Sequence, residues 1–186
     1  MSGRRVVALI GISGVGKTTL LTKTRTGLSF EHLQASELIR EEREYQGKSA
    51  ASDSAMQNAS LDENQLLLIE GFRRMVPANG LVVLDAHSVV DTPDGLFEIS
   101  SSVFERLEIS LFILLTEKPS EIVRRRSSDT NRRRSTRSIS EIGRQQMRSV
   151  QTTFRIARIL DVPVEILGSD KGKDLMDLLR ALAVSE

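Results

Sequence analysis

This chain contains the sequence Val6-Val7-Ala8-Leu9-Ile10-Gly11-Ile12-Ser13-Gly14-Val15-Gly16-Lys17-Thr18-Thr19, which is the strongest indication of its fold class. Within it, Gly11-x-x-x-x-Gly16-Lys17-Thr18 has the spacing of a phosphate-binding P-loop. A β-branched apolar run precedes the loop and a helical segment follows it, which is the context that this motif needs. Glycines let backbone N–H groups turn inward around a phosphate, and the helix N-terminus adds its positive dipole. We therefore expect the chain to bind a nucleoside triphosphate.

The loop and the first helical turn supply the residues expected to hold ATP and Mg²⁺. Lys17 has the length and charge to reach the β- and γ-phosphates, and the hydroxyl of Thr18 is a ligand for Mg²⁺. A glycine-rich turn without a ligand is the alternative, and the flanking strand and helix argue against it. The complete predicted donor-binding set is Gly11, Ser13, Gly14, Val15, Gly16, Lys17, Thr18 and Thr19.

Length and composition predict one compact domain spanning residues 1–186, which the order of strands and helices described below assigns to the α/β class. With 186 residues and 39% hydrophobic content, the chain can bury a core without covalent support. It has no cysteine, which excludes disulfides and thiolate zinc sites and fits a reducing cytoplasm. No segment approaches the length of a membrane span, and the basic and apolar start reads better as a first strand than as a secretory signal.

The small net charge of +1 conceals a strongly basic segment. Residues 124–158 contain eleven arginines and only two acidic residues. Such a segment is a solvated face, a nucleic-acid surface or a set of arginines that close over a nucleotide. With one tyrosine and no tryptophan available for base stacking, nucleic acid is the less favoured partner.

Apolar runs and helical periodicity alternate along the chain. We expect strands over residues 6–11, 28–33, 81–85, 111–115 and 164–167. Helices are expected over residues 17–26, from a cap at Ser36, from a capping box at Ser60 to about Met75, from Pro119, over 140–160 and over 173–184. This alternation predicts a five-stranded parallel sheet covered by helices on both faces, with ligands at the carboxyl ends of its strands.

Asp85 is the second candidate for chemistry, because an apolar strand leads straight into it. A carboxylate at the carboxyl end of a strand beside the P-loop strand can orient a Mg²⁺-bound water or bind the acceptor. A turn or helix-capping aspartate is the alternative. His87, two residues further on, is a candidate for contact with the acceptor, and a structural loop histidine is an equal alternative.

Three groups of residues together resemble the archaeal-type adenylate kinases, a branch of the nucleoside monophosphate kinases. They are the P-loop, residues 83–88 (Val-Leu-Asp-Ala-His-Ser) with Thr92-Pro93-Asp94-Gly95 after them, and Arg124-Arg125 followed by Asp129-Thr130 and residues 132–134. The resemblance implies a five-stranded P-loop core. It also implies a mobile helical segment for the monophosphate, at residues 34–76, and a small arginine-rich lid at 124–140.

The same resemblance implies roles for individual residues. It places Ser36 and Arg40 in the monophosphate segment and Asp85 with His87 near the acceptor. Arg124 with Arg132 or Arg133 would act on the transferring phosphoryl group, beside Lys17. Catalysis of phosphoryl transfer is positioning, charge neutralisation and exclusion of water, and arginines on a closing lid serve the second and third needs.

One departure from the family pattern leaves the acceptor open. Where the family usually has an arginine in the second monophosphate helix, this chain has residues 54–57, ending in Gln57, which cannot pair ionically with a phosphate. A nucleoside monophosphate, with AMP first, remains the expected acceptor. The alternatives are a kinase for another nucleotide or for an alcohol, with Asp85 as the base, and a regulatory ATPase that acts through a protein or RNA partner.

Overall fold

The computed structural model describes residues 3–48, 61–92, 94–128, 137–167 and 171–184. Its centre is a five-stranded sheet in the order β2-β3-β1-β6-β7, in which every neighbouring pair is parallel. The strands are β1 (Arg4–Ile10), β2 (Glu31–Gln34), β3 (Gly80–Ala86), β6 (Ile109–Leu114) and β7 (Val164–Ile166). This arrangement confirms the predicted sheet.

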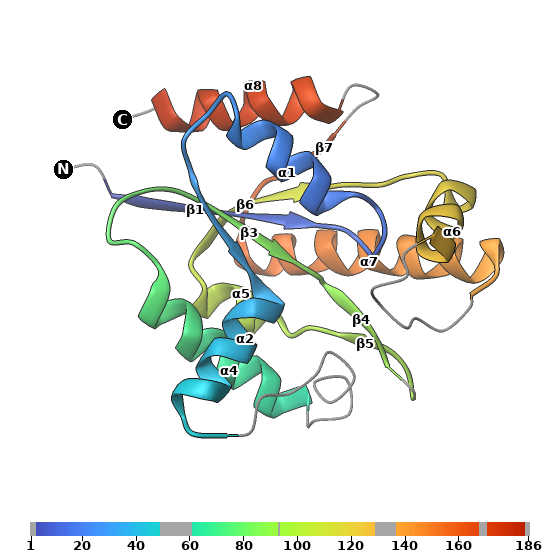
Figure 1. Ribbon diagram of the computed structural model, residues 1–186, viewed down its shortest axis with the longest axis horizontal. Coiled ribbons are helices and arrows are strands. Elements are labelled where there is room, and N and C mark those ends of the chain that lie inside the picture. Colours follow the sequence, from blue (N-terminus) through green and yellow to red (C-terminus); the bar gives the residue numbers. More distant parts are fainter. Residues whose placement is uncertain (1–2, 49–60, 93, 129–136, 168–170, 185–186) are drawn as a thin grey trace.

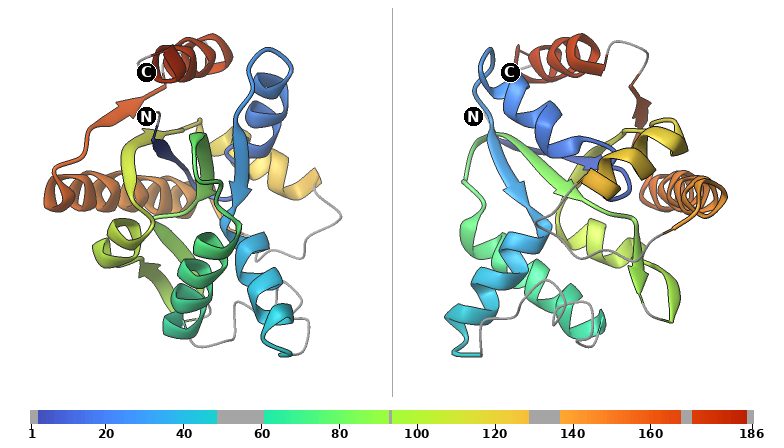
Figure 2. Two further views of the ribbon diagram at one scale, coloured as in Figure 1. Left: turned by 90° about the vertical axis from the view of Figure 1, so that its left-hand side faces the viewer. Right: turned by 45° about the vertical axis from the view of Figure 1, so that its right-hand side comes forward.

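Helices cover both faces of the sheet (Figures 1 and 2). On one face lie α1 (Lys17–Arg25) and α8 (Lys171–Val184). On the other lie α2 (Ala35–Tyr45), α4 (Leu61–Met75), α5 (Ser101–Arg106) and most of α7 (Ile139–Leu160). The remaining helix, α6 (Pro119–Ser128), lies at the carboxyl end of the sheet beside the start of α1.

Successive side chains of β1 point alternately into two separate hydrophobic cores, one on each face of the sheet. Val6, Ala8 and Ile10 face a core shared with α2, α4, α5 and α7, whereas Val7 and Leu9 face a core shared with α1, α6 and α8. All five side chains are at most 1% exposed. A strand buried on both faces reads as a continuous apolar run, which is why the sequence located β1 well.

Two predicted boundaries need correction. The strand expected over residues 28–33 is Glu31–Gln34, because its pairing with β3 begins only at Glu31. Ser36 does not cap α2, which begins at Ala35 after Gln34; the Ser36 hydroxyl instead accepts a hydrogen bond of 2.7 Å from the Gln34 amide. The capping box expected at Ser60 lies outside the described residues.

The structure adds an antiparallel hairpin that the sequence did not predict. Strands β4 (Val89–Thr92) and β5 (Gly95–Glu98) follow directly on the Asp85–His87 segment and lead into α5. Ion pairs tie this hairpin to the helix α7 and its start, from Arg137 to Asp91 and from Arg148 and Arg155 to Glu98. Three arginines of the basic segment are therefore paired with acids.

None of the described helices combines the length and the apolar character that a membrane crossing requires.

Candidate active site

The P-loop connects the carboxyl end of β1 to the start of α1. Gly14 and Gly16 have φ angles of 84° and 107°, a left-handed conformation that favours glycine. Gly16 is also the residue before α1, and no side chain within the described residues caps that helix. The positive end of the α1 dipole therefore faces the loop, which favours the binding of an anion such as a phosphate.

Lys17 joins the P-loop to two groups that follow β3. Its side chain is only 6% exposed, and Nζ donates a hydrogen bond of 2.6 Å to the Gly11 carbonyl. The same Nζ lies 3.4 Å from Oδ1 of Asp85 and 3.5 Å from Nδ1 of His87. The structure thus brings together three residues that the sequence singled out separately.

The sheet register explains why Asp85 is at this place. Asp85 is aligned with Leu9 on β1 and with Gln34 on β2, at the edge of the sheet where the parallel strands end. Its side chain is 7% exposed and pairs with Lys17. A buried carboxylate beside a buried ammonium holds charge ready for a phosphate and a cation while neither charge is left uncompensated.

His32 lies on β2, and two of the predicted acceptor residues, Ser36 and Arg40, lie on the helix that follows it. Burial lowers the pKa of His32, and the nearby carboxylate of Asp85 partly opposes that shift. Ser36 and Arg40 are both half-buried on α2, which directly follows β2. They are thus on the helix that follows β2, the strand next to β3 in the sheet, and Gln57 lies outside the described residues.

The arginines of α6 divide into two groups. Arg124 points away from the P-loop: its side chain is 69% exposed and pairs with Glu121 one turn earlier. Arg125 and Arg126 instead donate to the loop, Arg125 Nη1 to the Val15 carbonyl at 2.8 Å and Arg126 Nε and Nη2 to the Ser13 carbonyl at 2.9 and 2.7 Å. Arg132 and Arg133 lie outside the described residues.

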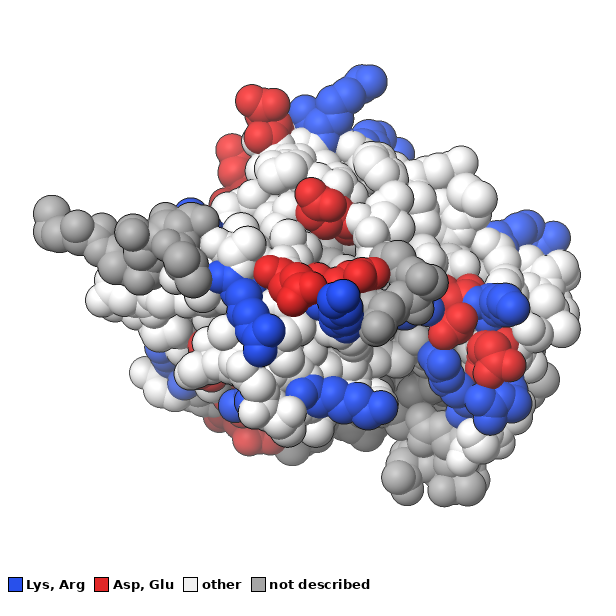
Figure 3. All heavy atoms as spheres, turned by 90° about the horizontal axis from the view of Figure 1, so that it is seen from above, with Lys and Arg blue, Asp and Glu red and all other residues white. Residues whose placement is uncertain are grey.

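Acidic and basic side chains alternate near α6 in the space-filling view (Figure 3). This interleaving fits the pairing of Arg124 with Glu121 and of Arg125 with Glu117. Arg124 and Arg125 are thus each paired with a carboxylate. Arg126, by contrast, donates to the Ser13 carbonyl and to the side-chain amide of Gln145.

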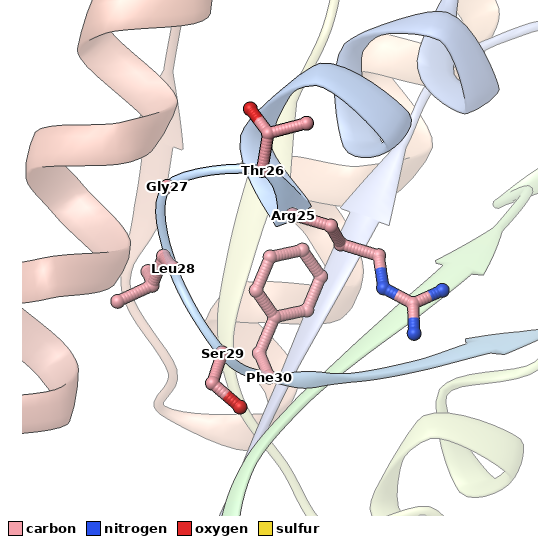
Figure 4. Close-up of a pocket in the computed structure, with 6 residues that line it drawn as sticks. All are labelled: Arg25, Thr26, Gly27, Leu28, Ser29 and Phe30. Carbon is pink, nitrogen blue, oxygen red and sulfur yellow. The ribbon is translucent and has the colours of Figure 1, made fainter.

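A pocket of about 370 Å³ lies at the opposite end of α1 from the P-loop. The turn from α1 to β2 forms it, with the Phe30 ring inside the turn and the Arg25 guanidinium extended toward the neighbouring strands (Figure 4). Its lining residues, 25–30, include none of the predicted site residues. A second pocket, between α7 and β7, is lined by Phe154, Arg158 and Val164 among others, and it too is separate from the P-loop.

The parallel sheet, the P-loop and the buried lysine–aspartate pair define a phosphotransferase of the P-loop kinase class. The chain belongs to the AAA domain family, whose model matches residues 10–143.

Curated proteins named adenylate kinase resemble the chain over nearly its whole length. The chain is 27% identical over 181 residues to that of Thermococcus kodakarensis, with 95% of this chain and 92% of the relative covered. It is 26% identical over 166 residues to that of Methanothermobacter thermautotrophicus, with 88% and 89% covered. The resemblance to archaeal-type adenylate kinases is confirmed.

Solved kinase structures share the fold. Shikimate kinase from Acinetobacter baumannii in complex with shikimate superposes with a TM-score of 0.60 at 14% identity, over 97% of this chain and 93% of that one. A gluconokinase from Sinorhizobium meliloti gives a TM-score of 0.53 at 12% identity, over 98% and 95%. At these identities the likeness concerns the fold.

Sequence reasoning missed the contacts on the outer side of the P-loop. Arg125 was noted as part of a motif and Arg126 only as part of a run, and neither was predicted to touch the loop. Gln145, buried on α7, accepts a hydrogen bond of 3.2 Å from Arg126 and had no signal in the sequence. For Glu117 the sequence does give a signal. This residue follows closely on the carboxyl end of β6, and ligands are expected at the carboxyl ends of the strands.

Proposed function

We propose that this chain transfers the γ-phosphoryl group of ATP, with Mg²⁺, to a nucleoside monophosphate, and that AMP is the acceptor. The observation that carries the proposal is the position of Lys17 Nζ, which lies within 3.5 Å of the Gly11 carbonyl, Asp85 and His87. An ammonium held at the P-loop, beside a carboxylate on the next strand, is the arrangement that positions and neutralises a transferring phosphoryl group.

The donor site takes its groups from the loop and the first turn of α1. We assign the binding of the phosphates to the backbone of residues 11–19 and to Lys17. When ATP binds, the Lys17 ammonium would move from Asp85 to the phosphates. The hydroxyl of Thr18, exposed on α1, and the carboxylate of Asp85 would hold Mg²⁺, and oxygen donors are those that this ion prefers. When bound, Mg²⁺ neutralises charge on the β- and γ-phosphates.

The acceptor site is assigned to the α2 side of the sheet edge. Ser36 and Arg40 would hold the monophosphate, His87 would contact it, and residues 34–76 would form its binding segment. Arg124, Arg132 and Arg133 would act on the transferring group when a lid formed by residues 124–140 closes. That closure has to turn Arg124 away from Glu121, with which it pairs at 2.8 Å.

The choice of AMP is supported by the relatives, of which the proteins of Thermococcus kodakarensis and Methanothermobacter thermautotrophicus are both named adenylate kinase and are covered over 92% and 89% of their length. An alcohol acceptor is the second candidate, because the buried Asp85 could take its proton, whereas a phosphate acceptor needs no base. Replacing Asp85 by Asn should therefore reduce an alcohol kinase far more than a monophosphate kinase.

The test is ADP release from Mg·ATP with each nucleoside monophosphate in turn, and without an acceptor. We expect AMP to stimulate release strongly. Lys17→Ala should lower kcat by about 100- to 1000-fold, the usual effect of removing one preorganised group that stabilises transition-state charge. Lys23→Ala is the matched control, since Lys23 is an exposed lysine near the other end of the same helix.

Each outcome decides between the candidates. AMP-dependent turnover that Lys17→Ala abolishes and Lys23→Ala leaves intact would support the proposal. ATP binding without stimulation by any monophosphate would refute it and point to an alcohol acceptor or to a regulatory ATPase that acts through a protein or RNA partner. Full activity in Lys17→Ala would refute the assigned mechanism.

A further inference from the structure

Two arginines of α6 hold the outer side of the P-loop. The carbonyls of Ser13 and Val15 accept hydrogen bonds from Arg126 and Arg125, respectively. In a trans peptide the C=O and the following N–H point in opposite directions. Fixing these two carbonyls on the α6 side therefore aims the N–H groups of Gly14 and Gly16 toward the opposite side, where the phosphates are expected.

Arg125 is itself held by Glu117. Oε2 of this carboxylate lies 3.0 Å from Nη2 of Arg125 and 3.1 Å from Nζ of Lys171 at the start of α8. Oε1 accepts a hydrogen bond of 2.9 Å from the N–H of Lys118. One carboxylate thus connects the loop after β6 with α6 and α8.

The backbone of Glu117 is fixed from a fourth direction. The side-chain amide of Gln146 on α7 accepts from the N–H of Glu117 and donates to its carbonyl, both at 3.0 Å. The N–H of Lys118 lowers the pKa of the Glu117 carboxyl most, burial opposes the shift, and Lys171 and Arg125 add to the lowering. The carboxylate is therefore ionised wherever the protein is folded near neutral pH.

We infer that Glu117 is a positioning residue for the donor site: it holds Arg125 against the Val15 carbonyl and so keeps the Gly16 N–H aimed at the phosphates of ATP. The inference rests on the proposed function only in naming ATP as the ligand. Glu117 does not touch the ligand in this role. It acts through Arg125, whose side chain is 38% exposed and would otherwise be free to turn toward solvent.

Simple electrostatics gives the opposite expectation, which makes the inference testable. A carboxylate near a site for a polyanion repels it, so removal of the Glu117 charge should by itself strengthen ATP binding. Positioning predicts that the same change weakens ATP binding. The sign of the effect thus separates the two explanations.

The experiment measures the dissociation constant of Mg·ATP by calorimetry, without an acceptor, for Glu117→Gln, Arg125→Ala and the double variant. We expect Glu117→Gln to weaken binding about tenfold, the effect of losing a charge-assisted hydrogen bond. In the Arg125→Ala background the same change should have little further effect, because Glu117 acts through Arg125. Thermal melts of each variant check that the fold is retained.

Glu98→Gln is the matched control. Glu98 is 19% exposed and pairs with two cations, Arg148 and Arg155, just as Glu117 is 20% exposed and pairs with Arg125 and Lys171. It belongs to the hairpin and not to the P-loop surroundings, so ATP binding should be unchanged.

Unchanged or tighter ATP binding in Glu117→Gln, or full additivity in the double variant, would overturn the inference. A wild-type chain that binds Mg·ATP but shows no turnover with AMP would refute the proposed function alone, and the binding cycle would still decide the role of Glu117. A wild-type chain that does not bind Mg·ATP would overturn both.

Discussion

Replacing Gly11 by Ala tests whether the packing around the P-loop sets both stability and donor binding. Gly11 is the first residue after β1, and a Cβ added there would lie 2.7 Å from the Leu115 carbonyl oxygen and 2.9 Å from Cγ1 of Val15. A shift of either neighbour would disturb an existing hydrogen bond or buried packing. The N–H of Leu115 is bonded to the Ile10 carbonyl at 2.8 Å, and Val15 is 2% exposed.

The size of the effect follows from these contacts. Since carbon–oxygen contacts in proteins are comfortable from about 3.3 Å, the loop or the end of β6 must shift by roughly 0.6 Å. Overpacking of this kind costs about 1–3 kcal/mol. The lower freedom of Ala in the unfolded chain offsets about 0.4–1 kcal/mol of that cost. We expect Gly11→Ala to lower the free energy of unfolding by about 1–2 kcal/mol, and Tm by about 2–8 °C for a chain of this size.

Donor binding should weaken as well. A displacement of 1 Å can reduce catalysis by about 100-fold, so a shift of about half that size predicts roughly a tenfold loss in kcat/KM for ATP. Thermal denaturation gives the first quantity, and steady-state kinetics with varied ATP gives the second.

Gly143→Ala is the control with the same chemical change. At Gly143, inside α7, the nearest contact of an added Cβ is Pro119 Cγ at 3.7 Å, an ordinary distance. Because Ala is favoured over Gly in a helix interior by about 1 kcal/mol, Gly143→Ala should raise Tm slightly and leave ATP binding unchanged. Gly11→Ala with wild-type Tm and wild-type kinetics would refute the packing argument.

The two remaining predictions concern stability. Ser138 caps α7, its hydroxyl accepting from the Glu141 N–H at 3.3 Å while the Glu141 carboxylate accepts from the Ser138 N–H at 2.7 Å. Ser138→Ala should therefore cost about 0.5–2 kcal/mol in denaturant titrations, and an unchanged midpoint would contradict the cap. N–H and cationic partners lower the pKa values of Glu117 and Glu141 below the ordinary value of 4.5. These two carboxylates therefore stabilise the fold fully above pH 4.5, and their contribution is lost as the pH falls through the lower pKa values of the folded protein. Melts from pH 7 to pH 3 should show Tm falling below about pH 4.5, and Glu117→Gln should remove part of that fall; a variant with the full wild-type slope would contradict its share.

Buried strands were the part of the fold most open to prediction. β1, β3 and β6 are apolar runs buried on both faces, and the sequence located each within two residues. The predicted position of β2 was wrong by up to three residues, because β2 is an edge strand of four residues. Its bounds depend on pairing with β3 rather than on its own composition. The Ser36 cap was wrong for a related reason: α2 begins as soon as β2 ends, so the helix is already under way at Ser36.

The β4–β5 hairpin was not predicted, although the sequence has a turn signal, Pro-Asp-Gly at residues 93–95, between two apolar pairs. Its stability depends on partners distant in the sequence. Arg155 lies 57 positions from Glu98, and Arg137 lies 46 positions from Asp91. The same pairs explain why the basic run of arginines could not be interpreted from charge alone.

The P-loop and the parallel sheet around it could be predicted from the amino-acid sequence alone. Both depend on local patterns: glycines at the positions with left-handed φ, a lysine at fixed spacing, and apolar runs long enough to be buried strands. The contacts that hold the loop in place are visible only in the folded structure. Arg125 and Arg126 reach carbonyls 110 and 113 positions away, and Glu117 meets Lys171 across 54 positions. Every residue has a backbone carbonyl, so the sequence does not indicate which carbonyl a distant arginine contacts. These contacts form only when α6, α7 and α8 pack around the carboxyl end of the sheet.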